Sequence, residues 1–265
     1  MARRITTLHV RRTEQLTPHM VRVVLGGDDL AAFPDTPFTD RYVKLQLPRP
    51  GVAYPEPFDA DRIRDELPRE QWPLIRTYTV RDLDRAAGEL TIDFVVHGDE
   101  GVAGPWAVAA APGDVLRFMG PGGAYAPDPD ADWYLFAGDE SALPAIGAAC
   151  EQIPAGRPVL AFLEVADDAE HQPLAGSPDV VWLHRDPARP DQLVDAVRAA
   201  TFPAGRVDAF VHGEAGFVRE LRLLLRDERD VPRESLSISG YWRRGRDEDG
   251  WQADKKAAKE AGTLL

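Results

Sequence analysis

The chain has a single cysteine, no long hydrophobic run and a shortage of positive charge, and each of these excludes a class of protein. Cys150 alone can form neither an internal disulfide nor a cysteine-rich zinc or iron–sulfur site. No apolar stretch reaches the roughly 18 residues of a membrane helix, and the first residues lack the apolar core of a secretion signal. The 44 acidic and 31 basic residues give a formal net charge of -13, which repels nucleic-acid phosphates. We therefore expect a cytoplasmic protein that neither inserts into a membrane nor binds nucleic acid.

The first half of the chain is rich in segments that are typical of strands. The whole chain, with 265 residues of which 44% are hydrophobic, is long enough for two modest globular domains. Segments with strand-like patterns lie at 5–10, 20–25, 42–47, 74–81, 89–97 and 115–120. Short helices are expected near 63–67, inside a proline-rich and charged loop, and near 102–110. This order predicts a small antiparallel β-barrel with one embedded helix.

The second half alternates strands with helices, after a linker at 121–132 that is rich in proline and aspartate. The expected strands are 133–137, 159–165, 180–183, 207–213 and 236–242, and the expected helices are 142–152, 192–200, 217–226 and 252–261. Such alternation predicts a parallel sheet covered on both faces, with ligands at the carboxyl ends of its strands. We expect two domains, a barrel over 1–125 and an α/β domain over 126–265.

One strand of the predicted barrel carries a concentrated set of binding side chains, Arg76-Thr77-Tyr78-Thr79. Tyr78 offers a flat face to a planar heteroaromatic ring, and Arg76 has the planar fork that grips phosphate. Strand side chains alternate, so Arg76 and Tyr78 share one face while Thr77 and Thr79 lie on the other. The same residues also suit an ordinary half-buried strand.

Two later segments can be interpreted in the same two ways. Small residues around Gly101 to Gly104 precede a helix, which suits a pyrophosphate at the helix start but also suits a plain helix start. Asp93 can bond sugar hydroxyls or simply be solvated, and His97 can lie beside a ring system or be structural.

Four motifs in order resemble the siderophore-interacting proteins, a family of FAD-containing ferric-siderophore reductases in the ferredoxin-reductase superfamily. The resemblance runs from Val10 to the tail. The motifs are Arg-Thr-Tyr-Thr at 76–79, Asp-Phe-Val-Val-His-Gly at 93–98, Gly-Asp-Glu-Ser-Ala-Leu-Pro-Ala-Ile at 138–146, and Gly-Tyr-Trp-Arg-Arg-Gly at 240–245.

The resemblance implies a set of FAD-binding residues in the barrel. By it, Arg76 contacts the phosphates, Tyr78 stacks on the isoalloxazine and Thr79 bonds its N5/O4 edge, with Thr77 in the same strand. The residues implied for the ribityl and ring region are Asp93, Val95 and His97, and those for the pyrophosphate and adenine side are Ala103, Gly104, Trp106 and Ala107. No metal ligands are expected, and His171 and His184 are expected to be isolated surface residues.

The second domain departs from the ordinary ferredoxin reductases at both nucleotide turns. A Gly-x-Gly-x-x-Pro turn is replaced by Gly138 to Pro144, in which Asp139, Glu140, Ser141 and Ala142 are the candidate nucleotide-binding residues. A Cys-Gly-Pro turn is replaced by 211–214. Asp139 and Glu140, in the first of these turns, would repel a 2'-phosphate unless they point elsewhere. Alternatively, Asp139 or Ser141 caps the following helix.

A basic and aromatic run follows the last expected strand. Trp242 is expected to cover the flavin face where nicotinamide or substrate approaches. The cations expected to attract an anionic ferric chelate are Lys44, Arg243, Arg244 and Arg246. The alternative is a solvated turn in which the arginines pair with the acids at 247–249. Glycine stands in 120–123 where many relatives have arginine, so the basic lining is expected to be thinner.

These features predict an FAD-dependent oxidoreductase that acts on ferric siderophores. A reduced nicotinamide would give hydride to the flavin, which would pass single electrons to Fe(III). Reduction releases iron because siderophore oxygens suit Fe(III) better than Fe(II). NADH, NADPH and reduced ferredoxin all stay open as donors, the last as a protein partner. Two alternatives stay open, a general NAD(P)H-dependent flavin or ferredoxin-type reductase, and a siderophore-binding protein without redox turnover.

Overall fold

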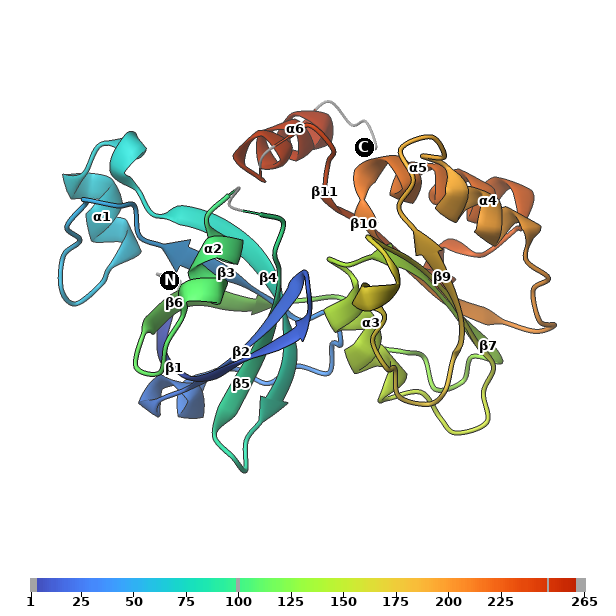
Figure 1. Ribbon diagram of the computed structural model, residues 1–265, viewed down its shortest axis with the longest axis horizontal. Helices are drawn as coiled ribbons and strands as arrows, with labels where there is room; N and C mark the ends of the chain where they lie inside the picture. The colour runs from blue at the N-terminus through green and yellow to red at the C-terminus, as the bar shows by residue number, and fades with distance from the viewer. Residues whose placement is uncertain (1–3, 99–100, 247, 261–265) are drawn as a thin grey trace. The chain divides into compact units, whose positions relative to one another are not determined.

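The computed structural model describes residues 4–98, 101–246 and 248–260. Contacts within the chain divide it into two units, with the division between Gly123 and Ala124. The first unit contains a closed antiparallel barrel, and the second contains a parallel five-stranded sheet with helices (Figure 1). The predicted fold class is confirmed.

The barrel closes in the strand order β1-β2-β5-β4-β3-β6. β1 continues well past its predicted end because its second half pairs with β2 down to the Thr17–Met20 pair, and a register shift between Val10 and Arg12 interrupts the alternation that marks a strand. The strands are β1 (Ile5–Thr17), β2 (Met20–Gly26), β3 (Tyr42–Leu47), β4 (Leu74–Asp84), β5 (Glu89–Val95) and β6 (Val115–Gly122).

Short helices lie in the loops of the barrel. Ala103 and Ala107 of α2 are buried in the barrel core, so this helix packs directly against the strands (Figure 1). α1 begins where the Asp59 carboxylate accepts hydrogen bonds from two backbone N–H groups of its first turn. The helices are α1 (Ala60–Glu66) and α2 (Ala103–Ala109), with single 3₁₀ turns η1 (Asp28–Ala32) and η2 (Arg69–Gln71).

The sheet of the second unit has the strand order β11-β10-β7-β8-β9, and all of its pairs are parallel. β7 is buried along its whole length, as expected for a central parallel strand. The segment that precedes it is anchored rather than loose, because Tyr125 Oη and Asp128 N both donate to the Asp208 carboxylate. The strands are β7 (Trp133–Asp139), β8 (Val159–Val165), β9 (Asp179–His184), β10 (Val207–Glu214) and β11 (Leu236–Trp242).

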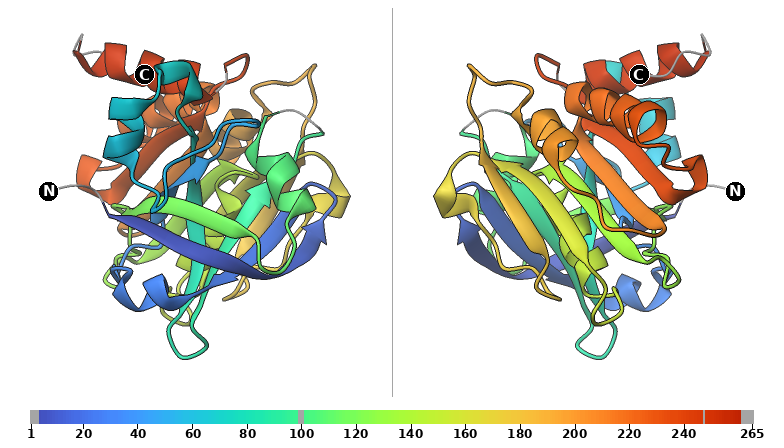
Figure 2. Two further views of the ribbon diagram at one scale, coloured as in Figure 1. Left: turned by 90° about the vertical axis from the view of Figure 1, so that its left-hand side faces the viewer. Right: turned by 90° about the vertical axis from the view of Figure 1, so that its right-hand side faces the viewer.

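Helices α4 and α5 share one hydrophobic core with β7 and β10, and they lie side by side in Figures 1 and 2. The eight residues of α3 are all buried, which fits a helix that is apolar all round. In α6, Trp251 is buried and Lys255 donates to the Gly240 carbonyl, so this tail helix packs on the end of β11. The helices are α3 (Leu143–Cys150), α4 (Gln192–Ala199), α5 (Ala215–Leu223) and α6 (Glu248–Glu260), with short turns η3 (Asp168–Glu170), η4 (Leu224–Glu228) and η5 (Arg233–Ser235).

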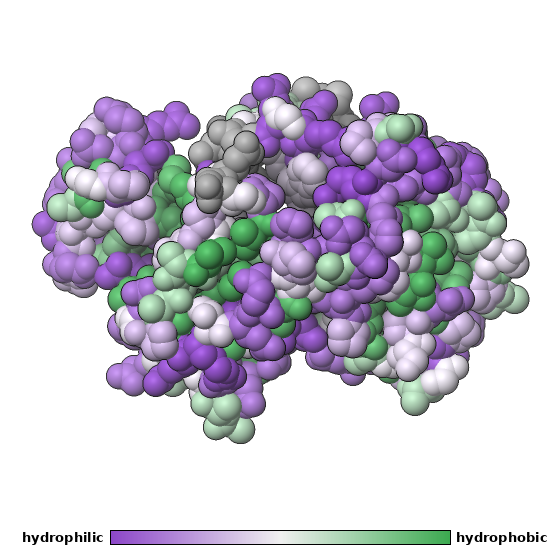
Figure 3. Space-filling model, in the orientation of Figure 1, coloured by the Kyte–Doolittle hydropathy of each residue, from purple (hydrophilic) through white to green (hydrophobic). Residues whose placement is uncertain are grey.

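Most side chains on the face drawn in Figure 3 are hydrophilic, in keeping with the charge of the chain. Among the residues that the structure describes, no helix combines the length and apolar character needed to cross a membrane.

Candidate functional site

The motif Arg76-Thr77-Tyr78-Thr79 lies in β4, between β3 and β5. Arg76, Thr77 and Tyr78 are half-buried and Thr79 is buried, so the strand places a cation, a ring and two hydroxyls at the barrel wall. The Arg76 guanidinium donates to the Ile75 carbonyl at 2.7 Å. The four side chains predicted to bind the cofactor therefore come from one continuous, hydrogen-bonded strand.

An aromatic group joins β4 to β5 and α2. The rings of Tyr78 and Phe94 lie 4.5 Å apart between centroids, and those of Phe94 and Trp106 lie 5.6 Å apart. Phe94 is fully buried while the other two rings are half-buried. The fold thus brings together Tyr78 and Trp106, which lie in separate predicted motifs, through a core residue that neither motif singles out.

The residues of the β5 motif have different environments. Arg22 grips Asp93 with two hydrogen bonds of 2.7 and 2.8 Å, and Asp93 is 4% exposed. The register of β2 against β5 places these two residues directly opposite each other, so the ion pair is a cross-strand pair. Val95 is half-buried at the end of β5, and His97 is exposed in the loop that follows.

Three of the four candidates in α2 are packing residues. Ala103, Gly104 and Ala107 are buried, the two alanines within the barrel core. Trp106 is half-buried, and Val108 on the same helix is 60% exposed. In Figure 3 hydrophobic residues gather over the part of the barrel around α2. Trp106 is therefore the α2 side chain best placed to meet a ligand.

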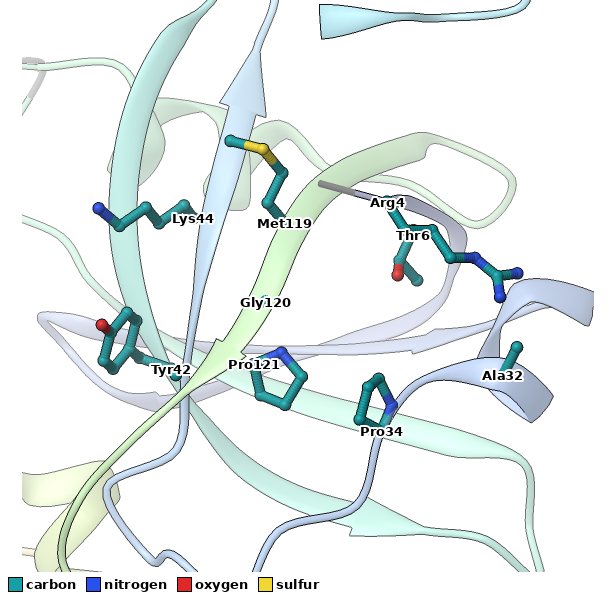
Figure 4. Close-up of a pocket in the computed structure, with 10 residues that line it drawn as sticks. Arg4, Thr6, Ala32, Pro34, Tyr42, Lys44, Met119, Gly120 and Pro121 are labelled. Atoms are coloured by element: carbon teal, nitrogen blue, oxygen red, sulfur yellow. The ribbon is translucent and has the colours of Figure 1, made fainter. Parts of the chain in front are cut away.

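A hollow of about 440 Å³ lies on the outside of the barrel and is lined from β1, β3 and β6 (Figure 4). Its volume is within the range of small-molecule sites. None of its described lining residues is acidic, although the chain as a whole carries a charge of -13. The lining residues are Arg4, Thr6, Ala32, Pro34, Tyr42, Lys44, Met119, Gly120, Pro121 and Gly122.

Lys44 and Tyr42 project from the same side of β3, while Val43 and Leu45 between and beyond them are buried in the barrel (Figure 4). Arg4 lies on the other side of Pro121, and its guanidinium is 3.5 Å from the Asp29 carboxylate. The pocket therefore has a cation on each side, one of them already paired with an acid.

The Tyr42 ring lies against Gly122 in the segment 120–123. A Cβ atom on Gly122 would lie 2.4 Å from Cζ of the Tyr42 ring, so a larger residue fits only if the ring moves. Tyr42 and Arg4 were not among the predicted site residues. The alternation of 42–47 was a sufficient signal for Tyr42, because it shares the outward face of β3 with Lys44. Arg4 was not identifiable before the pairing of β1 with β6 was known.

In the second unit, the turn between β7 and α3 is closed by hydrogen bonds between its own residues. Asp139 Oδ1 accepts hydrogen bonds from Ser141 N at 2.9 Å and from Ser141 Oγ at 2.5 Å. A Cβ on Gly138 would lie 2.7 Å from the His212 carbonyl oxygen, so β10 approaches too closely for any other residue. The alternative that Asp139 or Ser141 caps the helix is wrong, because Ala142 holds the N-cap position and no side chain bonds to the helix start. The Ser141 N–H is thus already used within the turn.

Asp139 also ties the ends of two further strands to β7. Its Oδ2 accepts hydrogen bonds from Glu214 N at 2.9 Å and from the Trp242 indole Nε1 at 2.8 Å. The residue is 1% exposed, and burial, with the nearby charge of Glu140, raises the pKa of its carboxyl to about 6. The indole of Trp242, predicted to cover the flavin, is therefore held by a carboxylate that titrates near neutral pH.

Glu140, the second acid of the turn, is neutralised by an arginine that sequence analysis did not select. Arg185 Nη2 lies 2.5 Å from Glu140 and its Nε lies 3.4 Å from Glu164, and both carboxylates are nearly buried. Glu164 also accepts a hydrogen bond from Gln192. These acids point to partners inside the unit, so the repulsion expected for a nucleotide phosphate is reduced.

The residues at 211–214, which replace the Cys-Gly-Pro turn, also bond to partners inside the α/β unit. His212 is buried, stacks on Phe210 with centroids 3.7 Å apart and shares a 2.9 Å hydrogen bond with Ser237 Oγ. Burial lowers its pKa to about 3, so the imidazole is neutral. Glu214 caps α5 by accepting hydrogen bonds from Gly216 N and Phe217 N.

The basic run after β11 is partly neutralised. Arg246 Nε lies 3.1 Å and Arg243 Nη1 lies 3.9 Å from the Asp254 carboxylate of α6. The backbone of Arg244 donates to Glu214, and its side chain is exposed. The acid that pairs with this turn is therefore Asp254, whereas the acids proposed for that role at 247–249 lie where the structure describes no side chain.

His171 and His184 are exposed, as predicted, but the prediction that they are isolated is wrong. Their Nε2 atoms lie 3.0 Å apart, and His171 stacks on Trp182. Among the described residues, no group of three or more His, Cys, Asp or Glu side chains is arranged to hold a metal ion.

Two family models match the chain. Residues 9–125 match the siderophore-interacting FAD-binding domain, and residues 131–245 match the siderophore-interacting protein model. Together these matches include nearly all of both units.

Individual relatives agree with the models. The ferric vibriobactin reductase ViuB of Vibrio cholerae is 35% identical and aligns over 92% of this chain and 91% of its own length. The NADPH-dependent ferric-chelate reductase of Escherichia coli is 33% identical over 90% of this chain and 93% of its own. The crystal structure of the siderophore-interacting protein SipS from Aeromonas hydrophila superimposes with a TM-score of 0.81 at 31% identity, covering 97% of this chain and 99% of that one.

Proposed function

Because this chain belongs to the siderophore-interacting protein family, we propose that it is an FAD-dependent oxidoreductase that reduces the iron of ferric siderophores. Relatives named for ferric-vibriobactin and ferric-chelate reduction support this activity. The observation that carries the proposal is the register of β3 against β4, which sets Tyr42 opposite Thr79 and Lys44 opposite Thr77. Tyr42 and Lys44 therefore share one face of the sheet with Thr79 and Thr77, while Tyr78 and Arg76 stand opposite Val43 and Leu45 on the other face.

The residues of the barrel fit FAD. The half-buried Tyr78 ring belongs to an aromatic group with Trp106, and Arg76, on the same face of β4, supplies a planar cation for phosphate. When bound, FAD supplies the ability to accept a hydride and to pass its electrons on singly. Tyr78 would orient the ring system and Arg76 would hold the phosphates. Asp93 would act indirectly, through its ion pair with Arg22 in the barrel wall.

The pocket beside Thr79 fits an anionic ferric chelate. Lys44 supplies positive charge, Arg4 supplies a second cation that is paired with Asp29, and no described lining residue is acidic. The Tyr42 ring offers an aromatic wall for the aryl groups of a chelator, and Pro121 offers an apolar floor (Figure 4). Reduction at this place would release the metal, because hard oxygen ligands hold Fe(II) less tightly than Fe(III).

We propose a reduced nicotinamide nucleotide as the donor, bound weakly at the carboxyl ends of β7 and β10. Weak binding is expected because Asp139 already takes the Ser141 N–H, which a phosphate would otherwise use. The neutralised Glu140 gives no strong reason to exclude the 2'-phosphate of NADPH. Reduced ferredoxin is the alternative donor.

An anaerobic reaction tests the proposal. The purified protein, reconstituted with FAD, is mixed with NADH or NADPH, a ferric catecholate chelate and an Fe(II) trap. We expect flavin absorbance, bleaching by the nucleotide and formation of trapped Fe(II). Bleaching without Fe(II) would indicate a general flavin reductase, and a flavin that bleaches only with reduced ferredoxin would replace the donor. Protein that binds the chelate but no flavin would contradict an enzymatic role.

A further inference from the structure

Two imidazoles from different elements of the second unit face each other at the surface. His171 follows η3 and His184 ends β9, and their Nε2 atoms lie 3.0 Å apart. Both residues are exposed. A hydrogen bond between the two Nε2 atoms requires one of them to carry a proton and the other to accept it.

The two rings are held in place by their surroundings. Trp182, two residues before His184 on β9, stacks on His171 with centroids 4.4 Å apart and an interplanar angle of 15°. His171 N donates to the Asp168 carbonyl, and the Gln192 amide donates to the His184 carbonyl at 2.7 Å. The nitrogens are therefore presented by ordered backbone on both sides, which lowers the cost of bringing them together on a ligand.

The spacing fits two adjacent ligands of one metal ion. Metal–imidazole bonds of about 2.05 Å place nitrogens at a right angle about 2.9 Å apart and at a tetrahedral angle about 3.3 Å apart. The observed 3.0 Å lies between these values. We propose that His171 and His184 form a two-histidine clip for a divalent late transition-metal ion, bound through both Nε2 atoms.

The chemistry of the clip sets its class of ligand. Imidazole suits Cu(II), Ni(II), Zn(II) and Fe(II), whereas Mg²⁺ and Ca²⁺ prefer oxygen. No third His, Cys, Asp or Glu completes a cluster among the described residues, so water fills the other positions and the ion exchanges readily. Affinity follows the Irving–Williams order, with Cu(II) above Ni(II). This site is independent of the flavin chemistry proposed above.

The test is a titration of untagged full-length protein with Cu(II) and with Ni(II), followed by calorimetry and by copper EPR. We expect one ion per chain and nitrogen hyperfine structure from two imidazoles. His171→Asn and His184→Asn each weaken binding at least about tenfold, because removing one ligand removes the chelate. His9→Asn, an exposed histidine of the barrel, serves as the matched control and leaves the affinity unchanged.

Imidazole ¹⁵N NMR gives a second measurement. In the free protein one of the two rings carries its proton on Nε2, and on adding Zn(II) both rings are expected to carry it on Nδ1. Equal affinity of the wild type and of the variant lacking both histidines would overturn the proposal. So would the unchanged tautomer of both rings at saturating Zn(II).

Discussion

The two units differ in how far their candidate binding side chains are buried and paired. In the barrel, Tyr78, Trp106 and Lys44 are only partly buried, and the pocket of Figure 4 holds cations with no described acid in its lining. In the α/β unit, Asp139 is buried and bonded to three other residues, and Glu140 is paired with Arg185. The barrel therefore keeps several of the side chains predicted to bind ligands partly exposed, while Asp139 and Glu140 of the α/β unit bond within that unit.

This difference indicates where affinity for ligands is concentrated. The buried carboxylates of Asp139, Glu140 and Glu164 accept from donors inside the α/β unit, which leaves few donors for a phosphate at the ends of β7 and β10. In the barrel a positive pocket persists on an acidic molecule, so local charge rather than net charge governs the approach of an anion. The following experiments challenge this contrast.

The largest effect is expected from Asp139, in the dependence of the free energy of unfolding on pH. Its carboxyl has a pKa of about 6 instead of the usual 3.8. The folded chain thus holds this proton at pH values where the unfolded chain has lost it. The free energy of unfolding should fall by roughly 3 kcal/mol between about pH 4 and about pH 6 from this group alone. Urea unfolding of wild type and Asp139→Asn measures it.

The variant should lose this part of the slope, whereas Asp227→Asn, which changes an exposed acid of η4, should keep it. The emission of Trp242, which bonds to the same carboxylate, should change with a midpoint near pH 6 in the wild type only. An unchanged slope in the Asn variant would show that Asp139 is ionised through this range.

The next effect tests the barrel as the cofactor site. Arg76→Ala should weaken FAD binding by about a hundredfold, because a charge-assisted contact to phosphate is lost. Equilibrium dialysis of the reconstituted protein measures the dissociation constant. Arg69→Ala, which removes an exposed arginine of η2, is the control. If both variants retained FAD equally, the phosphates would lie elsewhere.

A smaller loss of stability is expected when the ion pairs of Arg185 in the α/β unit are removed. Arg185→Met leaves Glu140 and Glu164 without their cation and should lower the free energy of unfolding by about 2 kcal/mol at neutral pH. This is less than for a fully buried pair because the Arg185 side chain is 35% exposed. Arg189→Met removes an exposed arginine nearby. Equal stability of the two variants would mean that the acids need no partner.

The smallest effect concerns the pocket. Lys44→Glu should lower kcat/KM for an anionic ferric chelate about tenfold, with the loss in KM and a weaker dependence on salt. Arg219→Glu makes the same change in net charge on an exposed face of α5 and should have little effect. A neutral ferric chelate should barely distinguish these variants. Equal losses in both would assign the effect to net charge instead of the pocket.

Much of the architecture was predictable because it depends on local pattern. Alternation marked the barrel strands, and the change to alternating strands and helices marked the parallel sheet. The ends of elements were less predictable, since β1 is extended by pairing with β2 across a register shift. The alternative that Asp139 or Ser141 caps α3 does not hold, because the Asp139 carboxylate is directed to Ser141 and to the ends of β10 and β11 instead.

The sequence by itself determined the kind of chain this is: strand-rich and then α/β, acidic, with its predicted binding residues clustered in β4 and after β11. Only the tertiary structure decided how distant residues meet. Phe94 joins Tyr78 to Trp106, Arg22 pairs with Asp93, and Arg185 neutralises Glu140. Each partnership depends on strand register and sheet order, which arise from the packing of the whole unit and leave no periodic trace along the chain.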